Sequence, residues 1–209
     1  MAQYSSNPTD RHWKGVKRIL HFVKKTTDTE IVLGKRNDIP AAMGRRNDIP
    51  VVMVPWKVIG FFDAAYMDDT QDRHSTMAYI FLYDSCAISW ASKKQQTVAL
   101  STTEAEYLAG TEATKEAIWI AAFLEEIGQK SEGPIQLQGD NQGANALAAN
   151  SEYHGRTKHI YGRQHFIMEM IKQKVIKVAY IPTKDIIADT LIKLLSREQY
   201  EQFMTMMEL

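Results

Sequence analysis

Three short segments rich in β-branched and aromatic residues follow one another closely and precede a long helical pattern. The segments are 58–63, 76–83 and 87–92, and the turn-like Asp84-Ser85 separates the last two. Segments of this kind with short connections are typical of antiparallel hairpins. The helical pattern covers 102–127 and ends at Gly128, a favoured residue just after a helix. The sequence therefore predicts three antiparallel strands followed by a long helix.

Further strands and helices alternate in the second half of the chain. Strands are predicted at 134–139 and 175–181, and helices at 141–150, 159–174 and 186–207. The complete order, βββαβααβα, predicts an α/β fold with a five-stranded mixed sheet. Three antiparallel strands would be extended by two parallel ones, and helices would flank the sheet.

The first 53 residues differ in character from the rest. Asn7 and Pro8 are a favourable cap and first-turn residue for a helix whose apolar and basic residues occupy opposite faces. A near-duplicate follows, 34–40 against 44–50, and each copy holds Gly, Asn-Asp and Pro. Two copies are too few for a solenoid, so we expect a linker or β-ribbon, and domains at 1–53 and 54–209.

Composition narrows the class of protein only modestly. Hydrophobic residues make up 44% and charged residues 24% of 209 positions, which is ordinary for a globular protein. Net charge is zero, with 25 basic and 25 acidic residues, but basic residues gather near the N-terminus and acidic ones later. An enzyme that binds divalent metal must concentrate carboxylates, which would mask a basic surface in the total, so the net charge does not exclude nucleic acid as a partner. No signal peptide or membrane-spanning run is evident, and the single cysteine, Cys86, fits a reducing compartment.

Four carboxylates are placed where they could converge. Asp63 ends the first strand of the sheet and Asp140 ends the fourth, whereas Glu106 and Asp189 lie in the first turns of two helices. If the two strands are neighbours, all four side chains can meet at one edge of the sheet. Such a cluster requires cations, and oxygen ligands favour Mg²⁺. Two ions could activate water and stabilise the leaving oxygen of a phosphodiester.

Glu104 and a group of histidines are the other candidate ligands near this cluster. Ser101 and Glu104 form a capping box, which gives Glu104 a structural role and leaves Glu106 as the ligand. The histidines at 154, 159 and 165 do not share a helical face, and no cysteine joins them, so a zinc site is not favoured.

Five motifs stand in order around these carboxylates. The most distinctive stretch runs Ser92-Lys93-Lys94-Gln95-Gln96-Thr97-Val98-Ala99-Leu100-Ser101-Thr102-Thr103-Glu104-Ala105-Glu106-Tyr107. Asp72-Arg73-His74-Ser75-Thr76 precedes it, and Asp140-Asn141-Gln142, Arg156-Thr157-Lys158-His159-Ile160 and Ala188-Asp189 follow in order. Together these motifs resemble the ribonuclease H domain of copia-type LTR retrotransposons. The resemblance covers roughly 58–195, and the segment from Asn7-Pro8 to Leu20 is similar to the tail that follows the polymerase in the same polyproteins.

The resemblance implies a fold, an activity and partners. It implies a ribonuclease H-like fold that cuts the RNA strand of RNA–DNA hybrids with two Mg²⁺ ions, for which Mn²⁺ could substitute. Asp63, Glu106, Asp140 and Asp189 would hold the ions. The expected nucleic-acid contacts are Lys93, Lys94, Asn141, Gln142, Arg156, Lys158 and His159, although Arg156, Lys158 and His159 could equally cap a helix. The reverse transcriptase part of the polyprotein is the expected protein partner, and no membrane is expected. The location would be intracellular: cytoplasm, virus-like particles or nucleus.

Several positions depart from the family pattern. Ala65 and Tyr66 stand where relatives often have Asp and Trp, and loop 182–185 lacks the histidine of many cellular ribonucleases H. Segment 190–195 also differs from the usual aromatic-Thr-Lys-Pro run. A catalytically weak or inactive nucleic-acid-binding module therefore remains an alternative, as does another nuclease or an integrase-like protein of the same fold.

Two further features receive ordinary structural interpretations. Tyr66-Met67-Asp68-Asp69 spells the catalytic box of reverse transcriptases, but too few residues precede it for a polymerase, so we interpret it as a loop after the first strand. Trp90 and Trp119 are predicted to lie in the core.

Overall fold

The computed structural model describes residues 7–27, 57–69, 72–83, 86–129, 133–141, 161–193 and 195–206. Contacts divide the chain into two units, Met1–Val32 with Leu209, and Leu33–Glu208. The predicted boundary at residues 53/54 falls outside the described residues and stays a prediction. None of the helices in the described segments has the length and apolar character that crossing a membrane requires.

The N-terminal unit contains helix α1 (Asp10–Lys25). The residue that caps this helix is Thr9, whose backbone N–H donates to Nδ1 of His12 at 3.1 Å. Our assignment of Asn7 and Pro8 as the cap and first turn was therefore wrong by two residues. None of the residues of α1 is buried within the described structure.

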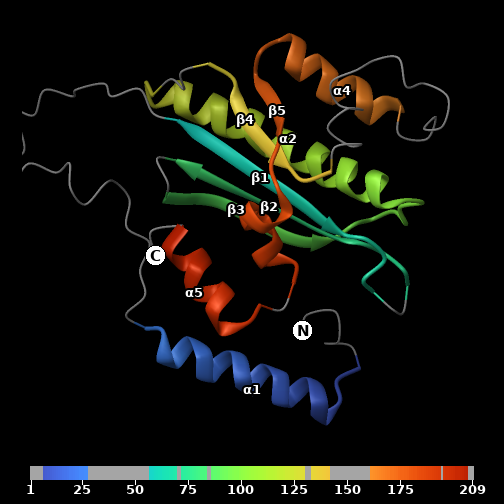
Figure 1. The fold of residues 1–209 in the computed structure, drawn as a ribbon, viewed down its shortest axis with the longest axis vertical. Helices are drawn as coiled ribbons and strands as arrows, with labels where there is room; N and C mark the ends of the chain where they lie inside the picture. Colours follow the sequence, from blue (N-terminus) through green and yellow to red (C-terminus); the bar gives the residue numbers. More distant parts are fainter. Residues whose placement is uncertain are drawn as a thin grey trace, which may run out of the picture. The chain divides into compact units, whose positions relative to one another are not determined.

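The second unit is built on five strands in the spatial order β3-β2-β1-β4-β5 (Figure 1). Their bounds are β1 (Val58–Ala65), β2 (Thr76–Tyr83), β3 (Cys86–Lys94), β4 (Ile135–Gly139) and β5 (Ile176–Tyr180). The first three pair antiparallel, and β4 and β5 add in parallel beside β1. This arrangement confirms the predicted mixed sheet.

Helices cover both faces of this sheet (Figure 1). Helix α2 (Thr102–Glu126) packs on β1, β2 and β4, and α4 (Tyr161–Lys172) packs on α2 and β5. The 3₁₀ helix η4 (Ile187–Leu191) packs on β1 and β2, and α5 (Arg197–Met206) contacts η4. Alternation along β1 sends Phe62 into the α2 core and Phe61 into the η4 core.

The ring of Phe62 holds β1 against α2 and β4. A Cβ added at Gly139 in β4 would lie 2.6 Å from Cζ of Phe62, and one added at Gly110 in α2 would lie 3.2 Å from its Cε2. A side chain at either position would therefore crowd the Phe62 ring, and glycine leaves room for it. Phe62 precedes Asp63, and Gly139 precedes Asp140, so this packing sets the spacing between two predicted ligands.

The predicted final helix at 186–207 is not continuous. The chain instead forms η3 (Thr183–Asp185), η4 and then α5. Ile186, Ile187 and Ala188 are all buried, and the tight 3₁₀ turn places these consecutive side chains against the sheet. A new helix starts after Ser196, whose Oγ accepts from the backbone N–H of Gln199 at 3.3 Å. The predicted helix at 141–150 lies outside the described residues.

We predict that Gly139→Ala destabilises the domain by about 1–3 kcal/mol, because the methyl group would overlap the ring of Phe62. Urea unfolding followed by fluorescence measures the change. Gly110→Ala should cost less, because its contact is looser and alanine favours a helix over glycine by about 0.5–1 kcal/mol. A larger loss for Gly110→Ala than for Gly139→Ala would contradict this packing account.

Candidate metal centre and nucleic-acid interface

Three of the four predicted carboxylates meet at one end of the sheet. Asp63 lies near the C-terminal end of β1, Asp140 directly follows β4, and Glu106 lies in the first turns of α2. Strands β1 and β4 are parallel neighbours, with Phe61 opposite Gln138, so their ends lie together. One carboxylate oxygen from each of the three residues lies within 4.8 Å of the others. This arrangement can hold a metal ion.

Asp189 approaches the same cluster from the other face of the sheet. It lies in η4, and its negative charge is close enough to raise the pKa of the Asp63 carboxyl group. The Nζ of Lys193 lies 2.6 Å from its Oδ1 and 2.9 Å from its Oδ2. Asp189 thus adjoins the cluster beside Asp63. The ammonium group of Lys193 contacts both carboxylate oxygens of Asp189.

Burial disfavours the charged form of the carboxyl groups in this cluster. Asp63 is 4% and Glu106 7% exposed. Burial raises the pKa of Asp63 well above its ordinary value, and the hydrogen bond and charge of Asp189 raise it further, although the hydrogen bond to Glu106 lowers it. Burial likewise raises the pKa of Glu106, and the charge of Asp63 adds to this effect. Without a cation, these carboxyl groups therefore retain protons far above their usual range.

Local hydrogen bonds orient two of the carboxylates. The backbone N–H of Ala64 donates to Oδ1 of Asp63 at 2.7 Å. The hydroxyl group of Thr183 donates to Oδ2 of Asp140 at 2.7 Å. In the sequence, Thr183 stands out only as part of the loop 182–185, which lacks a histidine. No motif signals this contact, because the two residues lie far apart in the sequence.

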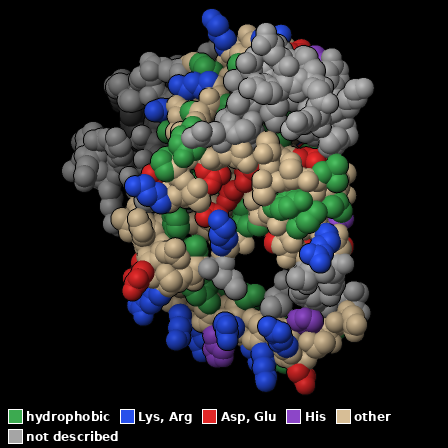
Figure 2. All heavy atoms as spheres, turned by 45° about the vertical axis from the view of Figure 1, so that its right-hand side comes forward, with side chains coloured by type: hydrophobic (Ala, Val, Ile, Leu, Met, Phe, Trp, Pro, Cys, Tyr) green, Lys and Arg blue, Asp and Glu red, His purple; other side chains and the backbone are tan. Residues whose placement is uncertain are grey.

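The donor set fits a hard divalent cation. All four side chains offer oxygen, which Mg²⁺ prefers. Oε2 of Glu106 is buried and has no hydrogen-bond partner among the residues that the structure describes. A buried, unpartnered carboxylate oxygen beside two further carboxylates is suited to a metal ligand. Figure 2 shows acidic side chains gathered on one face of the molecule, with basic side chains around them.

The two glutamates at the start of α2 have different surroundings. Ser101 Oγ accepts from the backbone N–H of Glu104 at 3.1 Å, and Oε2 of Glu104 accepts from the backbone N–H of Leu100 at 2.7 Å. Glu104 thus caps the helix start, reaching one residue further back than a standard capping box, while Glu106 points into the cluster.

The predicted nucleic-acid contacts are only partly within the described structure. Lys93 pairs with Glu112 at 2.8 Å. Lys94 pairs with Asp69, and with Asp72 at 2.9 Å, so its ammonium fastens the turn after β1. Asn141 directly follows Asp140. Gln142, Arg156, Lys158 and His159 lie outside the described residues and stay predictions.

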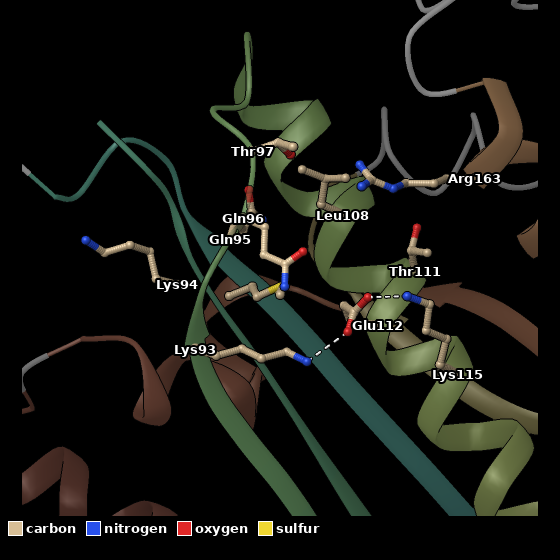
Figure 3. Close-up of a pocket in the computed structure, with 11 residues that line it drawn as sticks. Lys93, Lys94, Gln95, Gln96, Thr97, Leu108, Thr111, Glu112, Lys115 and Arg163 are labelled. Carbon is tan, nitrogen blue, oxygen red and sulfur yellow. Dashed lines mark hydrogen bonds and ion pairs between the residues drawn. The ribbon is translucent and has the colours of Figure 1, made fainter. Parts of the chain in front are cut away.

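A pocket of about 230 Å³ lies between the end of β3 and helix α2 (Figure 3). Lys93, Lys115 and Arg163 line it together with Gln96 and Thr97. Glu112 bridges the two lysines, because Lys115 lies 2.5 Å from its other oxygen. Leu108, Thr111, Glu112 and Lys115 also line the pocket from α2, and helical periodicity places Glu106 on a different side of that helix. The acidic cluster and this cation-rich pocket therefore flank α2.

Two tryptophans and the segment after β1 test further predictions from the sequence. Trp90 and Trp119 are 52% and 59% exposed, so their assignment to the core was wrong. Trp119 stacks on Phe123 along α2, with ring centroids 5.4 Å apart. The segment after β1 is a turn, as expected: Oδ1 of Asp68 accepts from the backbone N–H of Thr76, and Asp69 pairs with Lys94.

Comparison with solved structures places the fold. An RNase H1 isolated from compost covers 65% of this chain and 92% of its own, with a TM-score of 0.50 and 12% identity. The N-terminal RNase H domain of a Mycobacterium tuberculosis protein covers 71% of this chain and 96% of its own, with a TM-score of 0.50 and 10% identity. The chain therefore has a ribonuclease H-like fold, as its sequence predicted.

Sequence relatives of this chain include retrotransposon Pol polyproteins. The Pol polyprotein of transposon TNT 1-94 from Nicotiana tabacum is 38% identical over 201 residues, 96% of this chain. That of transposon RE2 from Arabidopsis thaliana is 36% identical over 203 residues, 97% of this chain. These relatives are Pol polyproteins of copia-type retrotransposons, and this chain spans 14% and 13% of their lengths. No protein-family model matches it.

We predict that the metal-free protein loses stability as pH rises above about 4, the unfolded pKa of carboxyl groups. The folded pKa values of Asp63 and Glu106 are raised, so the folded state holds protons that the unfolded state releases. For each group that keeps its proton in the folded state, the free energy of unfolding falls by about 1.4 kcal/mol per pH unit. Thermal unfolding in EDTA at pH 5 and pH 8 measures the difference.

Glu106→Gln removes one of the two carboxyl groups with a raised pKa, so it should raise the melting temperature of the metal-free protein at pH 8. Glu126→Gln, at the exposed end of the same helix, should not. A wild-type protein more stable at pH 8 than at pH 5 would contradict the assignment of buried, raised-pKa carboxyl groups.

Proposed function

We propose that this chain is a ribonuclease H that hydrolyses the RNA strand of RNA–DNA hybrids with divalent metal ions. The observation that supports this most strongly is the meeting of Asp63, Glu106 and Asp140, with oxygens within 4.8 Å of one another. The ribonuclease H-like fold and the retrotransposon Pol relatives support a ribonuclease H role.

The chain's own residues would prepare the site for metal. Asp63, Glu106, Asp140 and Asp189 would hold the ions through oxygen. Ala64 and Thr183 fix the orientation of Asp63 and Asp140. When bound, Mg²⁺ would activate a water and stabilise the developing charge on the phosphodiester. The protein contributes a group of carboxylates, two of them buried from water, at the end of two parallel strands.

Recognition of the substrate would rely on backbone shape and charge. A hybrid duplex offers 2′-hydroxyl groups and phosphates rather than a readable major groove. Because the acidic cluster and the cation-rich pocket flank α2, we propose that the two strands of a duplex contact opposite sides of this helix. Lys93, Lys115 and Arg163 would contact phosphate of the DNA strand. Asn141, beside Asp140, would contact the RNA strand.

The proposed biological setting follows from the relatives. We propose that the chain acts beside a reverse transcriptase in a longer polyprotein, inside the cell, and removes RNA during reverse transcription. Trp13 and Leu20 of α1 are exposed in the described structure and would offer such a neighbour an apolar surface.

We expect Mg²⁺-dependent cutting of the RNA strand of a labelled hybrid, and none in EDTA. Glu106→Gln and Asp140→Asn should each lower the rate at least about 100-fold, since even groups behind a metal ligand can matter 10–100-fold. Glu126→Gln is the matched control. Tight hybrid binding without cleavage in the wild type would support the binding-module alternative instead.

Arg163→Ala should weaken hybrid binding and reduce the slope of log K against log salt by about 0.7–0.9, the contribution of one phosphate contact. Lys172→Ala, in the same helix α4 but outside the pocket, should leave the slope unchanged. Fluorescence anisotropy with a labelled hybrid in Ca²⁺ measures both. An unchanged slope for Arg163→Ala would exclude this pocket from the interface.

A further inference from the structure

Lys193 is placed where a cation acts on the carboxylate cluster. Its backbone N–H donates to the carbonyl oxygen of Asp189 at 2.9 Å, in the turn that closes η4. The same turn brings its Nζ to 2.6 Å and 2.9 Å from the two oxygens of Asp189. In the sequence, Lys193 lies in segment 190–195, which differs from the usual aromatic-Thr-Lys-Pro run.

The electrostatic reach of this ammonium extends past its direct partner. The ordinary pKa of a lysine ammonium group is about 10.4, so this group is positively charged at physiological pH. It contacts both oxygens of Asp189, and Asp189 adjoins Asp63 in the cluster. It partly neutralises a cluster that burial makes unfavourable.

The Lys193 side chain is free to leave. It is 55% exposed, whereas its partner Asp189 is 16% exposed. Lysine also has a long, flexible stem that can carry its charge into solvent. A divalent ion that shares Asp189 with the ammonium would meet a like charge a few ångströms away. Metal and lysine thus compete for one carboxylate.

We propose that Lys193 is a displaceable counter-cation that holds Asp189 in the metal-free protein and lowers its affinity for divalent metal. This inference rests on the proposed function only in that the cluster must bind metal. Lys193 would set how much metal is needed to complete the site, and it is a positioning residue rather than a ligand.

The test is metal binding without nucleic acid. Calorimetric titration with Mn²⁺ should give a Kd about fivefold lower for Lys193→Met than for the wild type, the equilibrium factor of a partly exposed ion pair. In EDTA at pH 8 the same variant should melt at a lower temperature. Lys193→Arg should stay near the wild type in both. Arg197→Met, which breaks the exposed Arg197–Glu201 pair at 2.7 Å, should leave metal affinity unchanged.

The outcomes separate this inference from the proposed function. Wild-type protein with no saturable Mn²⁺ binding would overturn both. Wild-type binding that Asp140→Asn abolishes, with Lys193→Met bound equally or more weakly, would overturn the inference alone. Simple structural damage would weaken metal binding, so a tighter Kd cannot arise that way. If Lys193→Met fails to fold, Lys193→Gln removes the charge and keeps a hydrogen-bond donor, and the same tighter Kd is expected.

Discussion

The position of the Phe62 ring constrains the rest of this site. The ring fills space left open by Gly110 in α2 and Gly139 in β4. These are the two elements that carry Glu106 and lead into Asp140, and Phe62 itself directly precedes Asp63. Apolar packing on one face of β1 thus sets the separation of three carboxylates. Because protein interiors are densely packed and rigid, a small change in this contact would be transmitted to the cluster.

The packing imposes an electrostatic cost, and the structure offsets it in part. Asp63 and Glu106 are buried beside further carboxyl groups, so each holds a proton at pH values where an exposed acid would not. Lys193 supplies one positive charge at Asp189. A divalent ion would supply the remainder. Sites that store such unfavourable charge are common where function requires a ligand to bind.

Much of this arrangement could be predicted from the sequence, because the responsible interactions are local. The strands around Phe81, the helix cap at Ser101 and the carboxylates at strand ends follow from periodicity and capping rules. Glu106 could be separated from Glu104 for the same reason. The contacts between Thr183 and Asp140 and between Phe62 and Gly139 could not, since they join distant segments through tertiary packing. The break between η4 and α5 also escaped prediction, because the burial of Ile186, Ile187 and Ala188 against the sheet is a tertiary contact. The exposure of Trp119 escaped prediction because helical periodicity does not reveal which apolar face is covered.

Anomalous diffraction from crystals of the wild-type protein soaked in Mn²⁺ would show whether the carboxylate cluster binds a divalent metal. We expect an anomalous peak within coordination distance of the carboxylate oxygens of Asp63, Glu106 and Asp140. Well-ordered carboxylates with no peak between them, or a peak elsewhere on the chain, would contradict it.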